Sequence, residues 1–223
     1  MAKSFTFDVH NKRGLVKVPQ SIICDGMLSN AQVVLYCCIK AHIMKKDGVC
    51  AVKMSTLEKE CHLCARQISR HIADLEAHRL IEVKRVRKPV GTGFKNNVNE
   101  IRLVPLERRY KAPWAPFNGQ LVGKDRPSVR PCKSSDSSER REDTFGTLPF
   151  CVLYGTNLQD IAKRLYPYLK ARLGNQKHCR TSYEEIAGHL DQSQATIKRG
   201  LLELKNRDLI RYKQIHQGIE LQG

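Results

Sequence analysis

Two stretches of this chain, 129 residues apart, carry the same arrangement of apolar and basic residues. The first is CARQISRHIADLEAHRLIEVKR at 64–85, and the second is SQATIKRGLLELKNRDLIRYKQ at 193–214. Each contains an apolar series at helical spacing, an Arg two places after the first Ile, and a Leu-Ile pair near its end. The apolar series are Ile68, Ile72 and Leu75 in the first copy, and Ile197, Leu201 and Leu204 in the second. A repeat of this length predicts two copies of one small helical unit.

The residues around the first stretch predict the rest of that unit. Ser29 is placed to cap a helix over about 30–45, and CAVKM predicts a short strand after it. Ser55 and Glu58 have capping-box spacing at the start of a short second helix. A third helix is expected at about 65–79, followed by a strand LIEVKRVRK, a loop PVGTGFKNN and a returning strand NEIRLVP.

The second copy repeats this order with almost no insertion. LYPYLKAR at 165–172 corresponds to LYCCIKAH at 35–42, and Ser182 with Glu185 supplies a second capping box. LIRYKQIHQGIELQG predicts a shorter closing hairpin. Pro167 has no counterpart in the first copy, and a kink is expected there if the helix is continuous.

The composition of the segment between the two copies predicts a linker. The 43 residues from 105 to 147 contain five prolines and a serine-rich polar end, and such a segment buries too little apolar surface to offset its ordering entropy. We therefore expect an N-terminal domain at 1–104, a flexible basic linker at 105–147 and a C-terminal domain at 148–223. The predicted fold class is mainly α with small β-hairpins (α+β).

The N-terminus MAKSFTFDVHNKRG does not resemble a secretory signal. It lacks an apolar core, and Phe5, Phe7 and Val9 alternate instead as in a strand, with a loop expected before the first helix. No apolar run approaches the ~18 residues of a membrane span. The expected location is the cytoplasm, with no membrane partner.

The charge of the chain favours a polyanionic partner. There are 39 Lys and Arg against 22 Asp and Glu, which gives a formal net charge of +17. Residues 1–104 carry 18 basic and 9 acidic groups, and residues 148–223 carry 12 and 7. Because both halves are basic, the excess charge does not come from one tail.

Nine cysteines are predicted to be reduced and mostly structural. Cys61 corresponds to Leu190 of the second copy, a core position, and Cys64 corresponds to Ser193, a helix cap. Cys61 and Cys64 also have the C-x-x-C spacing of zinc ligands, but no second such pair follows. A zinc site would therefore need further thiols brought close by the fold, from among Cys37, Cys38 and Cys50.

The residue pattern of the first copy resembles the winged helix-turn-helix domains of bacterial, phage and plasmid regulators and replication proteins. The residues that match this pattern are Leu28, Ser29, Leu35, Tyr36, Thr56, Leu57, Ile68, Arg70, Ile72, Leu75, Leu80 and Ile81. The resemblance covers 28–103 and, as a second copy, 162–212. It implies two winged helix-turn-helix domains in which the third helix enters the DNA major groove and the hairpin forms a basic wing.

The expected DNA-binding residues follow from which side of each third helix is polar. The recognition helices offer Arg66, Gln67, Ser69, Arg70, Gln194, Thr196, Lys198 and Arg199, with His71 at the border of the first set. Arg can bond to guanine and Gln to adenine through two hydrogen bonds each, so these side chains suit base reading. The wings offer Lys84, Arg85, Arg87, Lys88, Lys95, Arg211 and Lys213, which suit phosphate contacts.

These observations predict a sequence-specific protein that binds double-stranded DNA, most readily a transcription regulator and possible homodimer, without cofactor or metal. No phosphate-binding loop, H-E-x-x-H or H-x-H motif occurs, so no catalytic residue is assigned and an enzyme is not expected. Two alternatives remain open. One is a non-catalytic replication initiator of a plasmid, phage or other mobile element, and the other is a protein-interaction adaptor built from winged-helix domains.

Overall fold

The computed structural model describes residues 14–43, 48–85, 87–90, 93–96, 100–105, 145–174, 176, 178–215 and 218–222. Within these ranges, helices are combined with small antiparallel sheets in a mixed α/β structure. We refer to residues 14–105 as the first half and to residues 145–222 as the second half. The predicted linker from 106 to 144 and the predicted strand at Phe5, Phe7 and Val9 lie outside the described residues.

The two halves contain the same elements in the same order. The first half contains β1 (Leu15–Pro19), α1 (Gln20–Ile23), α2 (Asn30–Ile43), β2 (Cys50–Ala51), α3 (Met54–Cys61), α4 (Ala65–Ala77), β3 (Ile81–Lys84), β4 (Arg87–Val90), β5 (Gly93–Asn96) and β6 (Glu100–Leu103). The second half contains β7 (Phe145–Pro149), α6 (Phe150–Leu153), α7 (Asp160–Leu173), β8 (His178–Ser182), α8 (Tyr183–Leu190), α9 (Gln194–Asn206), β9 (Arg211–Ile215) and β10 (Gly218–Gln222). Only β4 and β5 lack a counterpart within the described residues.

Left-handed backbone conformations recur at the repeat distance of 129 residues. His62 and Asp191, the C-caps of α3 and α8, have φ of 56° and 51°. Arg79 and Asp208, just beyond α4 and α9, have φ of 55° and 53°. Positive φ is uncommon for residues other than glycine, so its recurrence shows that both copies share the same turns.

Short side chains define the starts of several helices. Ser29 Oγ accepts a hydrogen bond from the backbone N–H of Gln32 at 3.3 Å, and Gln32 Oε1 accepts one from the Ser29 N–H at 2.8 Å. Ser182 Oγ and Ser193 Oγ likewise accept hydrogen bonds from the backbone N–H groups of Glu185 and Thr196, at the starts of α8 and α9. These caps confirm the predicted helix starts at Ser29 and Ser182. The prediction at Ser55 is wrong, because α3 begins one residue earlier and its N-cap, Lys53, makes no side-chain cap bond.

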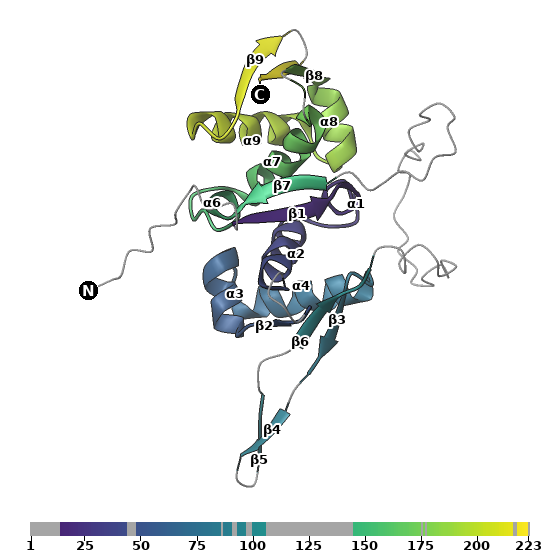
Figure 1. Cartoon of the computed structure of the whole chain (residues 1–223), viewed down its shortest axis with the longest axis vertical. Helices are drawn as coiled ribbons and strands as arrows, with labels where there is room; N and C mark the ends of the chain where they lie inside the picture. Colours follow the sequence, from purple (N-terminus) through teal and green to yellow (C-terminus); the bar gives the residue numbers. More distant parts are fainter. Residues whose placement is uncertain are drawn as a thin grey trace, which may run out of the picture.

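Each half closes with a small antiparallel sheet. The strand order is β2-β6-β3 in the first half and β8-β10-β9 in the second. β4 and β5 form a separate two-stranded hairpin, and Figure 1 shows it projecting beyond β3 and β6 at one end of the molecule. Residues 93–96, expected as part of a loop, form β5. The first half therefore has a second hairpin between β3 and β6.

The two halves are joined by an antiparallel pair of strands that the sequence did not predict. β1 lies in the segment expected to be a loop, and β7 begins at Phe145, three residues inside the predicted linker. Figure 1 shows this β1–β7 ribbon between the helices of the two halves. Residues 145–147, which the sequence assigned to the linker, thus belong to β7.

The core runs through both halves as one cluster of buried side chains. Its centre is formed by α2 and α7, which contact one another and are buried on nearly all sides. α7 is continuous across Pro167, whose backbone packs directly beneath β7. A Cβ at Gly146 would overlap the Pro167 carbonyl, so the strand needs a glycine at that point to approach the helix.

A buried arginine connects the halves. Arg164, on α7, is 1% exposed and donates four hydrogen bonds across the interface to the loop between α1 and α2. The acceptors are the carbonyl oxygens of Ile23 (2.7 Å), Leu28 (3.2 Å) and Asp25 (3.0 Å), and the side-chain oxygen of Asn30 (2.9 Å). Burial lowers the pKa of Arg164, while Cys24 and the acidic side chains nearby raise it.

Candidate nucleic-acid interface

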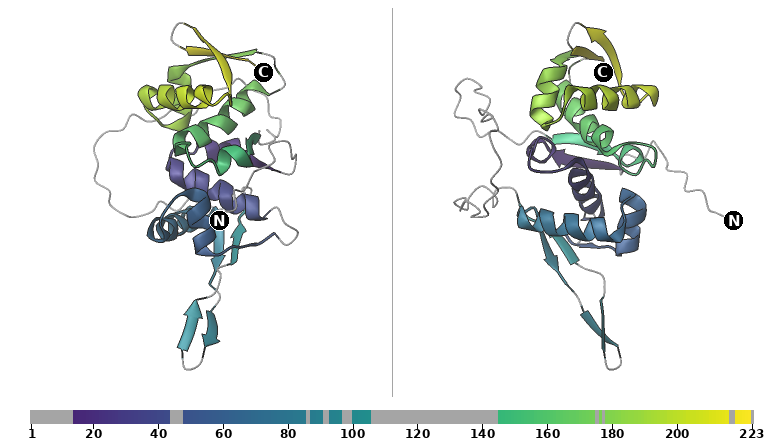
Figure 2. Two further views of the ribbon diagram at one scale, coloured as in Figure 1. Left: turned by 90° about the vertical axis from the view of Figure 1, so that its left-hand side faces the viewer. Right: turned by 180° about the vertical axis from the view of Figure 1, so that it is seen from behind.

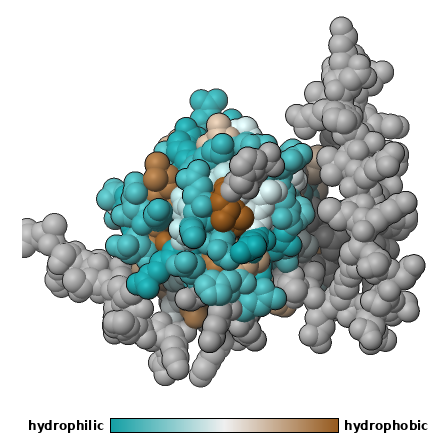
Figure 3. All heavy atoms as spheres, turned by 90° about the horizontal axis from the view of Figure 1, so that it is seen from above, coloured by the Kyte–Doolittle hydropathy of each residue, from teal (hydrophilic) through white to brown (hydrophobic). Residues whose placement is uncertain are grey.

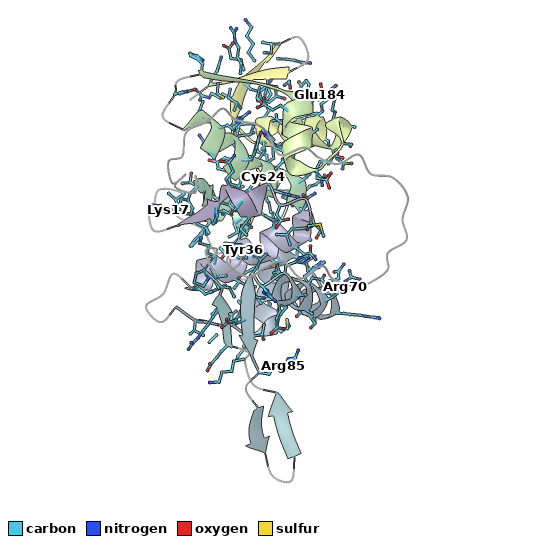
Figure 4. The ribbon with its side chains drawn as sticks, turned by 90° about the vertical axis from the view of Figure 1, so that its right-hand side faces the viewer. Lys17, Cys24, Tyr36, Arg70, Arg85 and Glu184 are labelled. Carbon is cyan, nitrogen blue, oxygen red and sulfur yellow. The ribbon has the colours of Figure 1, made fainter. Side chains whose placement is uncertain are left out.

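The helix pair α3–α4 presents one apolar and one polar side. Ile68, Ile72 and Leu75 of α4 are buried at 0%, 7% and 0% exposure, as the apolar spacing predicts. Three of the expected base-reading residues, Arg66, Ser69 and Arg70, are exposed on the other side of α4. Figure 4 shows the Arg70 side chain extending away from the body of the protein. α4 can therefore offer a basic outer side to a ligand without disturbing its core.

Two residues near the start of α4 have structural roles. Cys64 is the N-cap, and its backbone N–H donates to Oε1 of Gln67 at 3.2 Å. The amide of Gln67 is thus part of a capping box in this structure, although the side chain is exposed.

The assignment of His71 to the polar side is wrong. It is 9% exposed, with its Nδ1 3.7 Å from Asp74 Oδ2.

The corresponding helix α9 also has a basic outer side. Gln194, Lys198 and Arg199 are exposed, whereas Thr196 is half-buried and its hydroxyl lies 2.8 Å from Ser193 Oγ. Lys198 Nζ lies 4.9 Å from the centre of the Tyr183 ring, a cation–π contact at the start of α8. This contact draws the Lys198 ammonium towards α8.

Gly200 lies on the inner side of α9 for a packing reason. It is buried, and a Cβ at this position would be 3.4 Å from Leu165 Cδ2 and 3.6 Å from Ile161 Cγ1 of α7. A small residue therefore lets α9 approach α7 closely. The helix-propensity cost of about 1 kcal/mol relative to Ala is offset by this packing.

Several of the predicted basic residues lie on the hairpins that follow α4 and α9. Lys84, at the end of β3, and Arg85 are exposed, and Lys84 Nζ lies 3.6 Å from Glu100 Oε2. The strand register pairs Lys88 with Lys95 across β4 and β5, and Arg87 begins β4. In the second half, Arg211 and Lys213 are exposed on β9. Both third helices thus have a basic hairpin after them, and the first hairpin is the longer.

The two halves differ at the start of the helix before the turn. α3 has no acidic residue in its first turn and follows the exposed Lys53, whereas α8 has Glu184 and Glu185 in its first turn. A helix N-terminus attracts anions, and Lys53 adds to this attraction while the two glutamates oppose it. Sequence reasoning missed Lys53 because it placed the helix start at Ser55. The α3 end suits a phosphate better than the α8 end.

A recess beside α9 shows the same difference in charge. It is a cavity of about 430 Å³, open to solvent, between the start of α8, α9 and β9. The residues that line it are Ser182, Tyr183, Glu184, Gln194, Lys198, Gln214 and Ile215. One acidic and one basic side chain share the recess, so it has no strong preference for an anion.

The outer surface is mainly hydrophilic around these elements. Figure 3, which views the molecule from the second-half end, shows a largely hydrophilic face with small, separate apolar patches. Among the described residues, the exposed large apolar side chains are Leu15, Met27, Phe145 and Leu202. Leu15 and Phe145 belong to the β1–β7 ribbon, and Leu202 is on α9.

The cysteines serve mainly as core residues. Cys37, Cys38, Cys50 and Cys61 are buried, and Cys64 caps α4, as the repeat predicted for Cys61 and Cys64. Burial raises the pKa of the Cys37 thiol to about 12 and that of Cys50 to about 11, so both remain protonated at neutral pH. No group of three or more His, Cys, Asp or Glu side chains in the described part of the chain is arranged to hold a metal ion.

No protein-family model matches this chain, and a search of curated proteins found no relative. None of the helices in the ranges described above is both long and apolar enough to cross a membrane. The assignment of a function therefore depends on the geometry of the surface.

Proposed function

We propose that this chain is a non-enzymatic protein that binds double-stranded DNA in a sequence-specific manner. Its principal proposed role is that of a transcription regulator. In this proposal each half is a winged helix-turn-helix unit, α4 and α9 are the recognition helices, and the hairpins are the wings. The observation that supports it best is the exposed Arg66, Ser69 and Arg70 on α4, over a buried apolar side, followed by a basic hairpin.

Charge and shape support the same ligand. The net charge of +17 favours a polyanion, and a helix of 13 residues with one polar side fits the major groove. Arg70 and Arg66 can each donate two hydrogen bonds to a guanine. Lys53 and the wing residues can contact phosphates on either side of that groove.

The first half is proposed as the stronger binder. It has the longer wing, and the N-cap of α3 is Lys53, whereas α8 has Ser182 as its N-cap and Glu184 in its first turn. We expect most of the phosphate contacts, and therefore most of the salt dependence of binding, to come from this half.

The proposal is tested by selecting bound duplexes from a random DNA pool with the full chain at two salt concentrations. We expect an enriched motif whose affinity falls steeply as salt rises. Failure to enrich any sequence, with weak binding to every duplex, would exclude sequence-specific recognition and favour the adaptor alternative.

Two substitutions separate base reading from phosphate contact. Arg70→Ala is expected to weaken binding and to relax discrimination at one base position by ~1–3 kcal/mol. Lys88→Ala is expected to weaken binding to all sequences alike and to reduce the salt slope by about one. Lys17→Ala is the matched control, because Lys17 lies on the side of the molecule opposite Arg70 (Figure 4). Equal losses on every sequence from both test variants would contradict base reading by Arg70.

A replication initiator would use the same DNA-binding surface. The distribution of the selected motif in the source genome separates the two roles. Sites upstream of transcribed genes support the regulator, and repeated sites within a replication origin support the initiator.

A further inference from the structure

The β1–β7 ribbon relates the two halves by a local twofold axis. Its register pairs Leu15 with Pro149 and Pro19 with Phe145. Phe145 and Pro149 are the repeat counterparts of Leu15 and Pro19, 130 residues later. A twofold rotation that exchanges counterparts therefore converts one pairing into the other. Lys17 pairs with its own counterpart, Thr147, so the axis passes between these two residues. Such reciprocal pairing is the geometry of a symmetric dimer interface, here within one chain.

Contacts away from the ribbon follow the same axis. Asn30 Nδ2, at the start of α2, donates a hydrogen bond to Gln192 Oε1 in the turn before α9, at 3.5 Å. Burial raises the pKa of its counterpart Asp160, at the start of α7, and the charges of Lys163 and of His62, in the turn before α4, oppose this rise. The turn before α9 therefore contacts the start of the first long helix of the other half.

The axis directs both third helices to one side of the molecule. The twofold axis of an antiparallel strand pair is perpendicular to the ribbon, and rotation about it leaves the direction along the axis unchanged. Figure 4 shows Lys17 on one side of the molecule and Arg70 on the opposite side. Arg199, the counterpart of Arg70, must then point to the same side as Arg70. Figure 2, in its right-hand view, shows α4 and α9 at opposite ends of that face.

The distance between the two helices is held by buried contacts. Arg164 donates four hydrogen bonds across the interface, and the core is continuous through α2 and α7. Movement of one half against the other would expose this core and leave the acceptors of Arg164 without their donor. The position of α9 relative to α4 is thus set by tertiary packing and does not depend on the length of the segment from 106 to 144.

The exposed sides of α4 and α9 carry different side chains. Arg66 and Ser69 of α4 correspond to Ala195 and Lys198 of α9, and only Arg70 keeps its residue type, as Arg199. Two different sets of side chains related by a twofold axis recognise two different sequences in opposite orientations.

Resting on the proposed DNA binding, we infer that a single chain reads an imperfect inverted repeat, two unlike boxes in opposite orientation, at one fixed spacing. The stoichiometry is one chain for each pair of boxes. The ligand is therefore an asymmetric, pseudo-palindromic DNA duplex. A second copy of the chain is not needed to occupy both boxes.

The test uses the full chain and the duplex motif obtained by selection. Binding is measured to that duplex, to duplexes with about 5 or 10 base pairs inserted between the boxes, and to one with a box reversed. Both insertions and the reversal are expected to lower affinity roughly 100-fold or more, to the level of a single box, because the second contact is lost. The mass of the complex is expected to equal one chain and one duplex.

Insertion of a full turn, about 10 base pairs, is the decisive comparison. This insertion returns both boxes to the same face of the DNA. Two independent halves on a flexible tether would still bind both boxes and keep their affinity for the duplex, whereas a rigid chain can bind only one box and loses affinity. Retained affinity with this insertion, equal binding to the reversed box, or two chains on each duplex would overturn the inference and leave the proposed function standing. No selected motif at all would instead reject the proposed function.

A pair of substitutions checks the assignment of boxes. Arg70→Ala is expected to relax sequence preference in one box only, and Arg199→Ala in the other box only. If both variants altered the same box, or Arg199→Ala altered neither, α9 would not read the second box and the inference would fail.

Discussion

Arg164 forms four hydrogen bonds across the interface between the halves. Its repeat counterpart is Val34, so the four hydrogen bonds it makes to the α1–α2 loop have no equivalent across the twofold axis. A guanidinium can satisfy several carbonyl oxygens at once because its donors lie in a fixed plane. It therefore fixes the loop and joins the halves mainly through backbone carbonyl oxygens.

We predict that Arg164→Met lowers the free energy of unfolding by about 3 kcal/mol, because two buried carbonyl oxygens and one half-buried carbonyl oxygen lose their donor. The loss is measured by urea denaturation followed by circular dichroism. Arg199→Met removes an exposed arginine from the same half and is expected to change stability by no more than about 0.5 kcal/mol. Similar losses from both variants would contradict the role of Arg164 in the interface.

His189 is expected to make the stability of the chain dependent on pH. Its Nδ1 lies 2.7 Å from the hydroxyl of buried Tyr168, and burial together with the charge of Arg172 lowers its pKa below the ordinary value of 6.5. Protonation is thus penalised more in the folded state than in the unfolded state. The associated stability is present above pH 6.5 and is lost as the pH falls through the folded-state pKa.

We predict that the wild-type chain loses stability between pH 7 and about pH 5 more steeply than His189→Gln, which has no ring to protonate. Urea midpoints at each pH provide the measurement. Glutamine can still bond to Tyr168, so the two proteins should differ in slope more than in stability at pH 7. Parallel pH profiles would show that His189 is not responsible.

At the scale of elements, the helix caps of the two copies differ in chemistry. Ser193 Oγ accepts a hydrogen bond from Thr196 N–H at 3.2 Å, whereas the same position before α4 is occupied by Cys64. A thiol is a weaker acceptor than a hydroxyl, and serine is among the preferred N-cap residues. α4 therefore begins at a weaker cap than α9 does.

We expect Ser193→Ala to lower the free energy of unfolding by about 1 kcal/mol and Cys64→Ser to raise it by a smaller amount. Thermal unfolding of the two variants beside the wild type measures both effects, and hydrogen exchange at the first turns of α9 and α4 locates them. A loss of stability from Cys64→Ser would mean that sulfur packing outweighs capping at this site.

At the scale of the whole molecule, the shared core makes the halves depend on one another. α2 and α7 pack together at its centre, and the β1–β7 ribbon takes one strand from each half. Separating the halves would expose both surfaces to water, so each half alone keeps only part of the burial that stabilises the full chain.

We predict that the full chain unfolds in one cooperative transition, and that residues 14–105 or 145–222 expressed alone do not fold stably. Coincident urea curves from far-UV and near-UV circular dichroism test the first statement. The dispersion of the NMR amide signals of each fragment tests the second. Two separate transitions, or a folded fragment, would show that the halves are independent domains.

Local spacing in the sequence determined the helices that carry the candidate site. The period of Ile68, Ile72 and Leu75 predicted both the extent of α4 and its buried side, and the repeat placed a second such helix at α9. These features depend on interactions between residues three or four positions apart, which a single sequence displays. The repeat also correctly assigned Cys61 to the core and Cys64 to a cap.

Only the tertiary structure decided how the halves are joined. β1 and β7 are five-residue strands whose partners are about 130 residues apart, and β7 contains glycine and proline, which have low strand propensity. Lys163 and Arg164 are adjacent charged residues typical of a helix surface, yet both are buried, and Arg164 forms its hydrogen bonds across the interface. Pairing over such distances depends on which surfaces meet when the chain is compact, and no local period in the sequence records it.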